Sequence, residues 1–129
     1  MVRSLHPTTI EITTDEHLTE RGDCIIGVGA AKGCSQLGET LKTALRSNRT
    51  KVTIRVQVDG QSFVLAAEGD EGLELSHPHD IVIRKSRFVS DRTLAVAASA
   101  SARDIPRSIV SKLKNPRTVG ELEIKVHGI

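Results

Sequence analysis

The stretch from His77 to Asp80 reads His-Pro-His-Asp and holds the residues best suited to bind a metal ion. On a strand, His77 and His79 would point to the same face, and Asp80 follows directly. Imidazole and carboxylate groups are common ligands of divalent metals, so this spacing is compatible with one ion. The competing interpretation is that His-Pro begins a strand and the imidazole of His77 binds loop carbonyls. No stronger signature, such as Cys-x-x-Cys or His-Glu-x-x-His, accompanies the stretch.

A metal bound by His77, His79 and Asp80 would favour a hydrolase, for example an endonuclease. Glu123 and Lys125 add the carboxylate-x-lysine spacing in which the acid helps to bind Mg²⁺ and the lysine positions the attacking water. Both residues lie on the polar side of an alternating strand, however, so exposure to solvent is the favoured interpretation of this pair.

Two histidines and two aspartates occupy equivalent places in the two halves of the chain. His6 and His77 each precede a proline, and Asp23 and Asp91 each fall at a turn before an apolar segment. These four residues suggest a small-molecule binding module with one ligand pocket in each half. The alternative is structural, because a carboxylate at such a turn can accept backbone N–H bonds and hold the turn.

The basic residues concentrate in the second half of the chain. Residues 1–76 hold 8 Lys and Arg against 11 Asp and Glu, whereas residues 77–129 hold 10 against 5. A basic surface attracts phosphates, so the leading hypothesis is a nucleic-acid-associated protein whose affinity falls with salt. The phosphate-binding candidates are Arg84, Lys85, Arg87, Arg92 and Arg117. With two Phe and no Trp or Tyr, the chain offers few aromatic rings for stacking on bases.

Cys24 and Cys34 are the two cysteines of the chain. A thiol near a helix start can have a lowered pKa, so Cys34 could be reactive. The favoured interpretation is a small, partly buried side chain, because Arg92 and Ala102 stand at the equivalent places of the second half.

An internal repeat organises these residues. Residues 23–60 match residues 91–128 at a constant offset of 68 without a gap. Eight positions are identical: Asp23/Asp91, Val28/Val96, Ala30/Ala98, Leu45/Leu113, Arg49/Arg117, Thr50/Thr118, Val58/Val126 and Gly60/Gly128. Apolar positions also match, and the similarity extends upstream to the two His-Pro pairs when three residues are dropped. The sequence therefore predicts a duplication with a pseudo-two-fold axis.

Each half is expected to contain two strands, a helix and a third strand. Alternating apolar residues over 52–58, followed by Asp59-Gly60, predict a hairpin with a type I′ turn that sets Val56 opposite Phe63. Apolar residues at helical spacing predict a helix after Ser35 and a second one after Asp104, each capped by that residue.

These elements predict an α+β fold in a single domain, residues 1–129. Two ββαβ copies, at about residues 6–60 and 77–128, would form a barrel-like or strongly bent sheet with two outer helices. A closed six-stranded barrel is the preferred topology. With so few aromatic residues, the core should be aliphatic. No segment has the length of a membrane span and the first residues lack a signal-peptide apolar region, so we expect a cytoplasmic protein.

Three segments together resemble an archaeal family. They are Thr8-Thr-Ile-Glu-Ile-Thr, the run from Leu18 to Ala30, and the run from His77 to Ala95. The sequence is similar in them, and over nearly its whole length, to domain of unknown function 371. The resemblance implies an archaeal cytoplasmic protein and carries no established activity.

Overall fold

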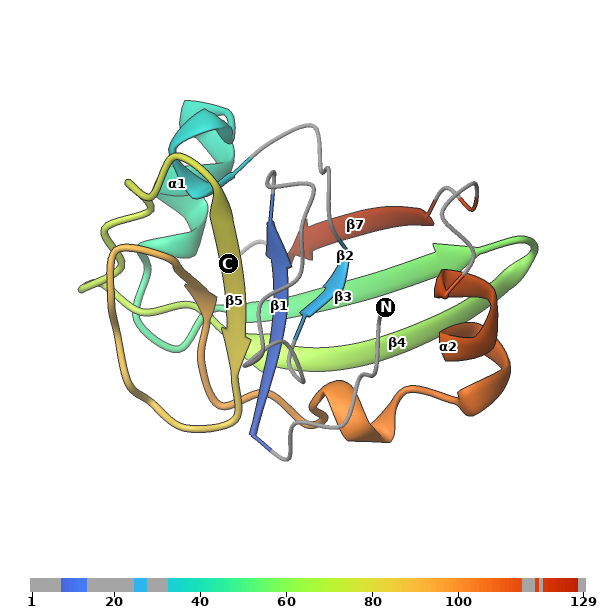
Figure 1. Cartoon of the computed structure of the whole chain (residues 1–129). Coiled ribbons are helices and arrows are strands. Elements are labelled where there is room, and N and C mark those ends of the chain that lie inside the picture. Colours follow the sequence, from blue (N-terminus) through green and yellow to red (C-terminus); the bar gives the residue numbers. More distant parts are fainter. Residues whose placement is uncertain (1–7, 14–24, 28–32, 115–117, 119, 128–129) are drawn as a thin grey trace.

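The computed structural model describes residues 8–13, 25–27, 33–114, 118 and 120–127 (Figure 1). Its strands form two sheets, and two helices lie at opposite ends of the molecule. The strands are β1 (Thr9–Thr13), β2 (Ile25–Gly27), β3 (Lys51–Val58), β4 (Gln61–Glu68), β5 (Asp80–Arg84), β6 (Thr93–Ala95) and β7 (Gly120–Val126). The helices are α1 (Glu39–Leu45) and α2 (Arg107–Leu113), preceded by the 3-10 turns η2 (Cys34–Gln36) and η3 (Ala102–Asp104).

The first sheet has the order β2-β1-β5-β6. Its central strands β1 and β5 are antiparallel, and each carries a short parallel strand on its outer side. Both outer pairs shift register at equivalent places, between Glu11 and Ile12 and between Val82 and Ile83. The two sides of this sheet are therefore built in the same way.

The second sheet has the order β4-β3-β7, with all neighbours antiparallel. Strands β3 and β4 form the predicted hairpin, and Val56 lies opposite Phe63 as expected. Asp59 and Gly60 have φ angles of 47° and 79°, as a type I′ turn requires. The hairpin prediction is confirmed.

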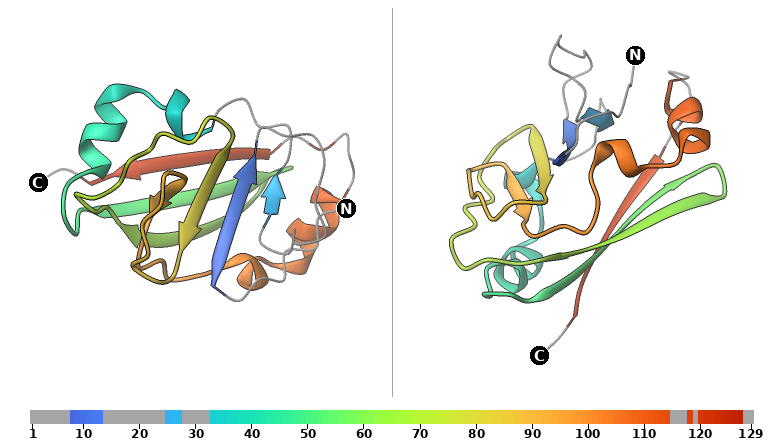
Figure 2. Two further views of the ribbon diagram at one scale, coloured as in Figure 1. Left: turned by 60° about the vertical axis from the view of Figure 1, so that its left-hand side comes forward. Right: turned by 90° about the horizontal axis from the view of Figure 1, so that it is seen from below.

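The closed barrel is wrong, because the described strands form two separate sheets (Figure 2). The shortness of β6, an edge strand of the first sheet, explains the difference. Strand β6 has three residues, and Ala97 just after it takes a φ of 51°, which extended strands do not use. Beyond β6 the chain meets the second sheet through an isolated bridge between Val96 and Glu68 and through hydrogen bonds between Ser99 and Ala66. The coarser expectation, a mixed fold of sheets with two helices, is confirmed.

The helices begin later than predicted. Ser35 and Asp104 lie in 3-10 turns rather than at the helix starts, and α1 and α2 begin four and three residues further on, at Glu39 and Arg107. In the second half Pro106 explains this, since the residue before a proline avoids the helical conformation. Asp104 caps instead the turn in which it lies, because its Oδ2 accepts the Ser101 N–H at 2.8 Å.

Equivalent elements of the two halves follow each other at the spacing of the sequence repeat. The first residues of three such pairs are Ile25 and Thr93, Cys34 and Ala102, and Glu39 and Arg107. Arg55 lies opposite Glu123 in the β3–β7 pair, and Glu11 lies opposite Val82 in the β1–β5 pair. In each case the sequence repeat relates the two opposed residues, as a pseudo-two-fold axis would require, and the duplication itself stays a prediction.

The two sheets share one hydrophobic cluster, so they pack against each other. Fully buried members include Ile10 and Ile83 of the first sheet, Ile54 of the second sheet and Ile109 of α2. The core is aliphatic as expected, and Phe88 lies outside it with 61% of its surface exposed. Among the described residues, no helix is long and apolar enough to cross a membrane.

Candidate functional site

An exposed aromatic ring stands on the loop between β5 and β6, next to basic residues. Phe88 is 61% exposed, and the guanidinium of Arg84 lies over its ring at 4.9 Å from the centroid. Arg84 is also anchored to β6, because its Nε donates to Thr93 Oγ1 at 2.8 Å. We call Arg84, Lys85, Arg87 and Phe88 the Phe88 corner.

Side-chain hydroxyls shape the loop that carries this ring. Ser86 Oγ accepts the Phe88 N–H at 3.3 Å, and Thr93 Oγ1 accepts the Ser90 N–H at 3.0 Å. The Ala97 N–H donates to the Ser86 carbonyl at 3.0 Å and ties the loop to the chain beyond β6. These contacts fix the start and the end of the loop and leave Phe88 at its outer side.

Carboxylates accompany three of the predicted phosphate-binding residues. Lys85 Nζ lies 3.6 Å from Asp104, and Arg87 Nη2 lies 2.8 Å from Glu68. The hydrogen bond from Arg87 lowers the pKa of Glu68, and the backbone hydrogen bond from Ser101 is the main cause of a lowered pKa at Asp104. Both acids are therefore ionised at neutral pH and reduce the positive potential of the surface.

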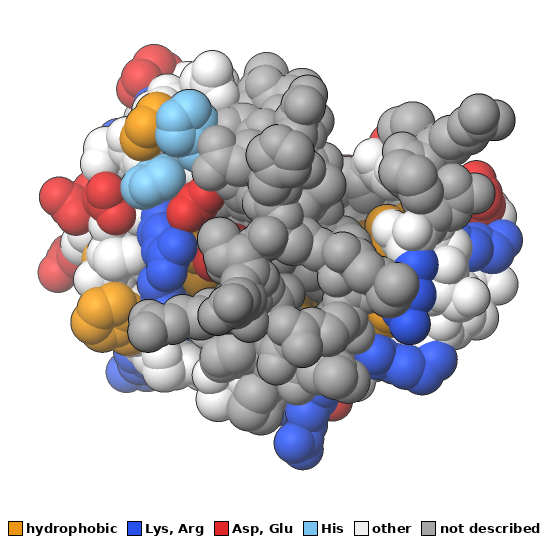
Figure 3. All heavy atoms as spheres, in the orientation of Figure 1, with side chains coloured by type: hydrophobic (Ala, Val, Ile, Leu, Met, Phe, Trp, Pro, Cys, Tyr) orange, Lys and Arg blue, Asp and Glu red, His pale blue; other side chains and the backbone are white. Residues whose placement is uncertain are grey.

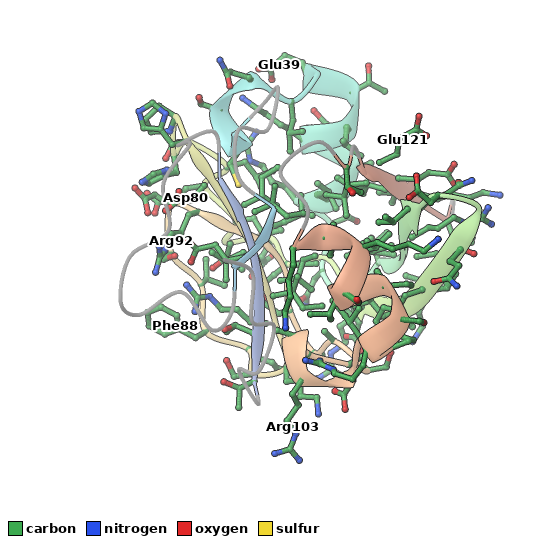
Figure 4. The ribbon with its side chains drawn as sticks, turned by 45° about the vertical axis from the view of Figure 1, so that its right-hand side comes forward. Glu39, Asp80, Phe88, Arg92, Arg103 and Glu121 are labelled. Carbon is green, nitrogen blue, oxygen red and sulfur yellow. The ribbon has the colours of Figure 1, made fainter. Side chains whose placement is uncertain are left out.

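Arg92 bridges two acids. Its Nη1 lies 2.9 Å from Asp80 and 3.3 Å from Glu11. Glu11 is 8% exposed, and a carboxylate so well buried requires a partner of opposite charge. Figure 4 shows Asp80, Arg92 and Phe88 on the same side of the molecule. On this face, histidine side chains also lie close to acidic and basic side chains (Figure 3). Arg117, the remaining predicted phosphate ligand, lies outside the described residues.

His77 uses its ring nitrogens within the chain. Nδ1 accepts the backbone N–H groups of His79 and Asp80 at 3.1 and 2.8 Å, so the proton of the neutral ring sits on Nε2. Nε2 in turn faces Asp80 Oδ2 at 3.9 Å. The imidazole therefore holds a turn, although with backbone N–H groups rather than the expected carbonyls.

Of the predicted metal ligands, His77 and His79 precede β5 and Asp80 is its first residue, so the three do not share a strand face. His77 and His79 meet edge to face, with ring centroids 6.2 Å apart. In this arrangement the lone pair on His77 Nδ1 already accepts backbone N–H groups. Among the described residues, no group of three or more His, Cys, Asp or Glu is placed to hold a metal. Metal binding by His77, His79 and Asp80 stays a prediction that requires this turn to open.

The predicted ligand pocket falls partly outside the described residues, as do His6 and Asp23. Asp91 is exposed, and its main-chain carbonyl accepts the N–H groups of Ser76 and His77, each at 3.0 Å. Asp91 thus fixes the start of the turn at His77 through its backbone. The pocket itself stays a prediction.

Cys34 is buried and protonated. Burial, with smaller contributions from Asp80 and Asp91, raises the pKa of its thiol to about 12. Its Sγ donates to the Arg92 carbonyl at 3.3 Å. The reactive interpretation is therefore wrong, and the small buried side chain is confirmed. Cys24 lies outside the described residues.

Gly33 allows the first half to approach the His77 turn closely. A Cβ at this position would lie 2.6 Å from the backbone of Pro78. The neighbouring Ser35 N–H donates to the His77 carbonyl at 2.9 Å. The absence of a side chain at Gly33 therefore permits this close packing.

Comparison with known proteins identifies relatives without an assigned activity. The family described as Domain of unknown function (DUF371) matches residues 1–127. The uncharacterized protein MJ0206 of Methanocaldococcus jannaschii is 44% identical over 113 residues, which cover 88% of this chain and 83% of that protein. The resemblance noted in the sequence is thereby confirmed.

Proposed function

Since the chain belongs to the family described as Domain of unknown function (DUF371), we propose a function from its surface: it binds single-stranded nucleic acid at the Phe88 corner. The observation that carries the proposal is an aromatic ring with 61% exposure beside basic side chains. A single exposed apolar side chain needs no explanation by itself, but an aromatic ring beside cations is the combination on which single-strand binders stack bases.

Phe88 has the features of a stacking platform. The Arg84 guanidinium lies over the ring at 4.9 Å, and Arg84 is itself anchored to Thr93, so the ring is supported from within the protein. The exposed part of the ring can then stack on a base. Such stacking contributes about 1–3 kcal/mol per base and does not depend on sequence.

The neighbouring cations would guide the phosphates. Lys85 and Arg87 are each about two-fifths exposed, with side-chain values of 38% and 46%, so phosphate oxygens can reach them. They must exchange Asp104 and Glu68 for phosphate, which limits the affinity. Each phosphate neutralised on a single strand should add about −0.7 to the slope of log affinity against log salt.

The described residues favour binding over catalysis. The Cys34 thiol is protonated, and the His77 nitrogens face backbone N–H groups and Asp80. No specific observation favours the metal-dependent hydrolase or the small-molecule module, so nucleic-acid binding is the function put forward here.

Fluorescence anisotropy with labelled oligo-dT and oligo-rU at low salt tests the proposal. Phe88→Ala should weaken binding about tenfold, because one stacking contact is lost. Phe88→Trp should retain it. Val64→Ala is the matched control, since Val64 is the other large exposed apolar side chain among the described residues, at 51%. No binding by the native protein, or equal weakening by both alanine variants, would contradict the proposal.

A further inference from the structure

Strand β7 has an open edge. It pairs with β3 on one side, and among the described residues no strand pairs with its other side. The His127 N–H donates to the Lys51 carbonyl at 2.9 Å, which places the odd-numbered residues of β7 in the hydrogen-bonded pairs with β3. In an antiparallel ladder these pairs alternate with unbonded ones. The N–H and C=O groups of Leu122, Ile124 and Val126 therefore point outward at the open edge.

The chain itself shows that this kind of edge accepts an antiparallel strand. Strands β3 and β7 occupy equivalent positions, since Arg55 lies opposite Glu123 at the centre of their pair. On its far side β3 carries β4, joined by the two-residue turn at Asp59 and Gly60. The equivalent place beside β7 lacks such a strand among the described residues. Its occupant must supply a strand of similar length.

We propose that a second copy of this chain fills this place, with β7 pairing antiparallel to β7 of the partner. The six strands would then run β4-β3-β7 and, in reverse order, β7-β3-β4 of the partner. A closed two-fold pair uses both open edges at once and leaves none for further growth.

Charge selects the register. Outward main-chain groups belong to even-numbered residues, so even residues must face even residues across the new pair. Placing Ile124 opposite its own copy sets Glu123 opposite the partner's Lys125 and Glu121 opposite the partner's His127. If the register shifts by two residues in one direction, Glu123 faces the partner's Glu123. If it shifts by two residues in the other direction, Lys125 faces the partner's Lys125. Opposite charges across strands stabilise a pair and like charges destabilise it.

The side chains of the edge support the same partner. Leu122, Ile124 and Val126 are partly buried and pack on the core, so a second strand beside them would cover more apolar surface. About six main-chain hydrogen bonds would form in this register. One strand pair is a small interface, below the roughly 1,200 Å² of stable complexes, so the dimer should dissociate on dilution.

Sedimentation velocity over roughly 1 µM to 1 mM tests the proposal, in the range of weak complexes. We expect a monomer at the low end and a dimer at the high end. A monomer throughout, or a species that grows beyond a dimer, would overturn the inference. Binding of nucleic acid is not needed for this readout, so its outcome is independent of the proposed function.

A charge exchange tests the register. Lys125→Glu should raise the dissociation constant roughly tenfold, because Glu123 would then face a second acid. Glu123→Lys should do the same through two facing lysines. Mixing the two variants should restore a dimer, since every facing pair is again of opposite sign. Failure of the mixture to associate would overturn this register.

The control is Arg103→Glu, the same kind of charge change on η3, where Arg103 projects from the other end of the molecule (Figure 4). It should dimerise like the native protein. Circular dichroism of each variant shows whether the fold is intact. Equal weakening by Arg103→Glu and Lys125→Glu would assign the effect to net charge and overturn the assignment to β7.

Discussion

The two edge strands of the second sheet differ in their hydrogen bonds to the rest of the chain. At β4 the Glu68 N–H donates to the Val96 carbonyl at 2.8 Å, and the Ala66 N–H donates to Ser99 Oγ at 3.0 Å. At β7 the corresponding outward groups meet no strand among the described residues. Proteins usually protect sheet edges, because open main-chain groups attract other strands. The chain therefore covers β4 at Ala66 and Glu68, whereas the open edge of β7 is where we propose that a partner strand pairs.

Matched truncations of the two edge strands should give the largest effect. Leu65 of β4 is 2% exposed, whereas Leu122 of β7 is only partly buried. Leu65→Ala should lower the free energy of unfolding by about 2–5 kcal/mol, and Leu122→Ala by roughly half as much. Urea unfolding of dilute protein measures both. Equal losses would show that β7 is as firmly embedded as β4 and would remove the comparison.

Opening the sealed edge should have a moderate effect. Ser99→Ala removes the acceptor of the Ala66 N–H but keeps the bond from the Ser99 N–H to the Ala66 carbonyl, at 2.8 Å. The free energy of unfolding should fall by about 0.5–1.5 kcal/mol. The amide of Ala66 should also exchange faster with solvent, while that of Thr53 stays unchanged. No change at Ala66 would show that Ser99 does not protect this edge.

A pH titration should show the smallest effect. The hydrogen bond from Arg87 lowers the pKa of Glu68 below its usual value of 4.5, so the folded state binds this proton less readily than the unfolded chain. The contribution is therefore complete above pH 4.5 and is lost as the pH falls through the lowered value. Glu68→Gln should be slightly less stable than the native protein at pH 7 and equally stable near pH 2. A constant difference between them would contradict the role of this pair.

Local patterns predicted the second sheet well. Alternation over 52–58 and the Asp59-Gly60 turn determine a hairpin and its register by themselves, and the structure has both. The helix starts were wrong by a few residues, because η2 and η3 use the residues expected as caps. Short 3-10 turns differ little from helix starts in their sequence, so pattern alone does not separate them.

The sequence did not predict the contacts between residues that are far apart in the chain. The sequence did not predict that β6 ends after three residues or that Ala97 takes a positive φ, a conformation that is uncommon for alanine. The pairing of Arg92 with Glu11 and Asp80 joins residues from three distant strands or loops. The sequence did contain a signal for the exposed ring of Phe88, because this aromatic residue stands between basic residues. The low aromatic content, with two Phe in the chain, led away from a stacking site.

Amide hydrogen exchange at several protein concentrations tests the difference between the edges most directly. The amides of Ala66 and Glu68 should be protected at every concentration. Those of Leu122, Ile124 and Val126 should exchange rapidly in dilute protein and become protected as the concentration rises, while those of Glu123 and Lys125 stay protected by β3. Rapid exchange of the three even-numbered amides at all concentrations, or their protection in the dilute monomer, would contradict an open edge that a second copy fills.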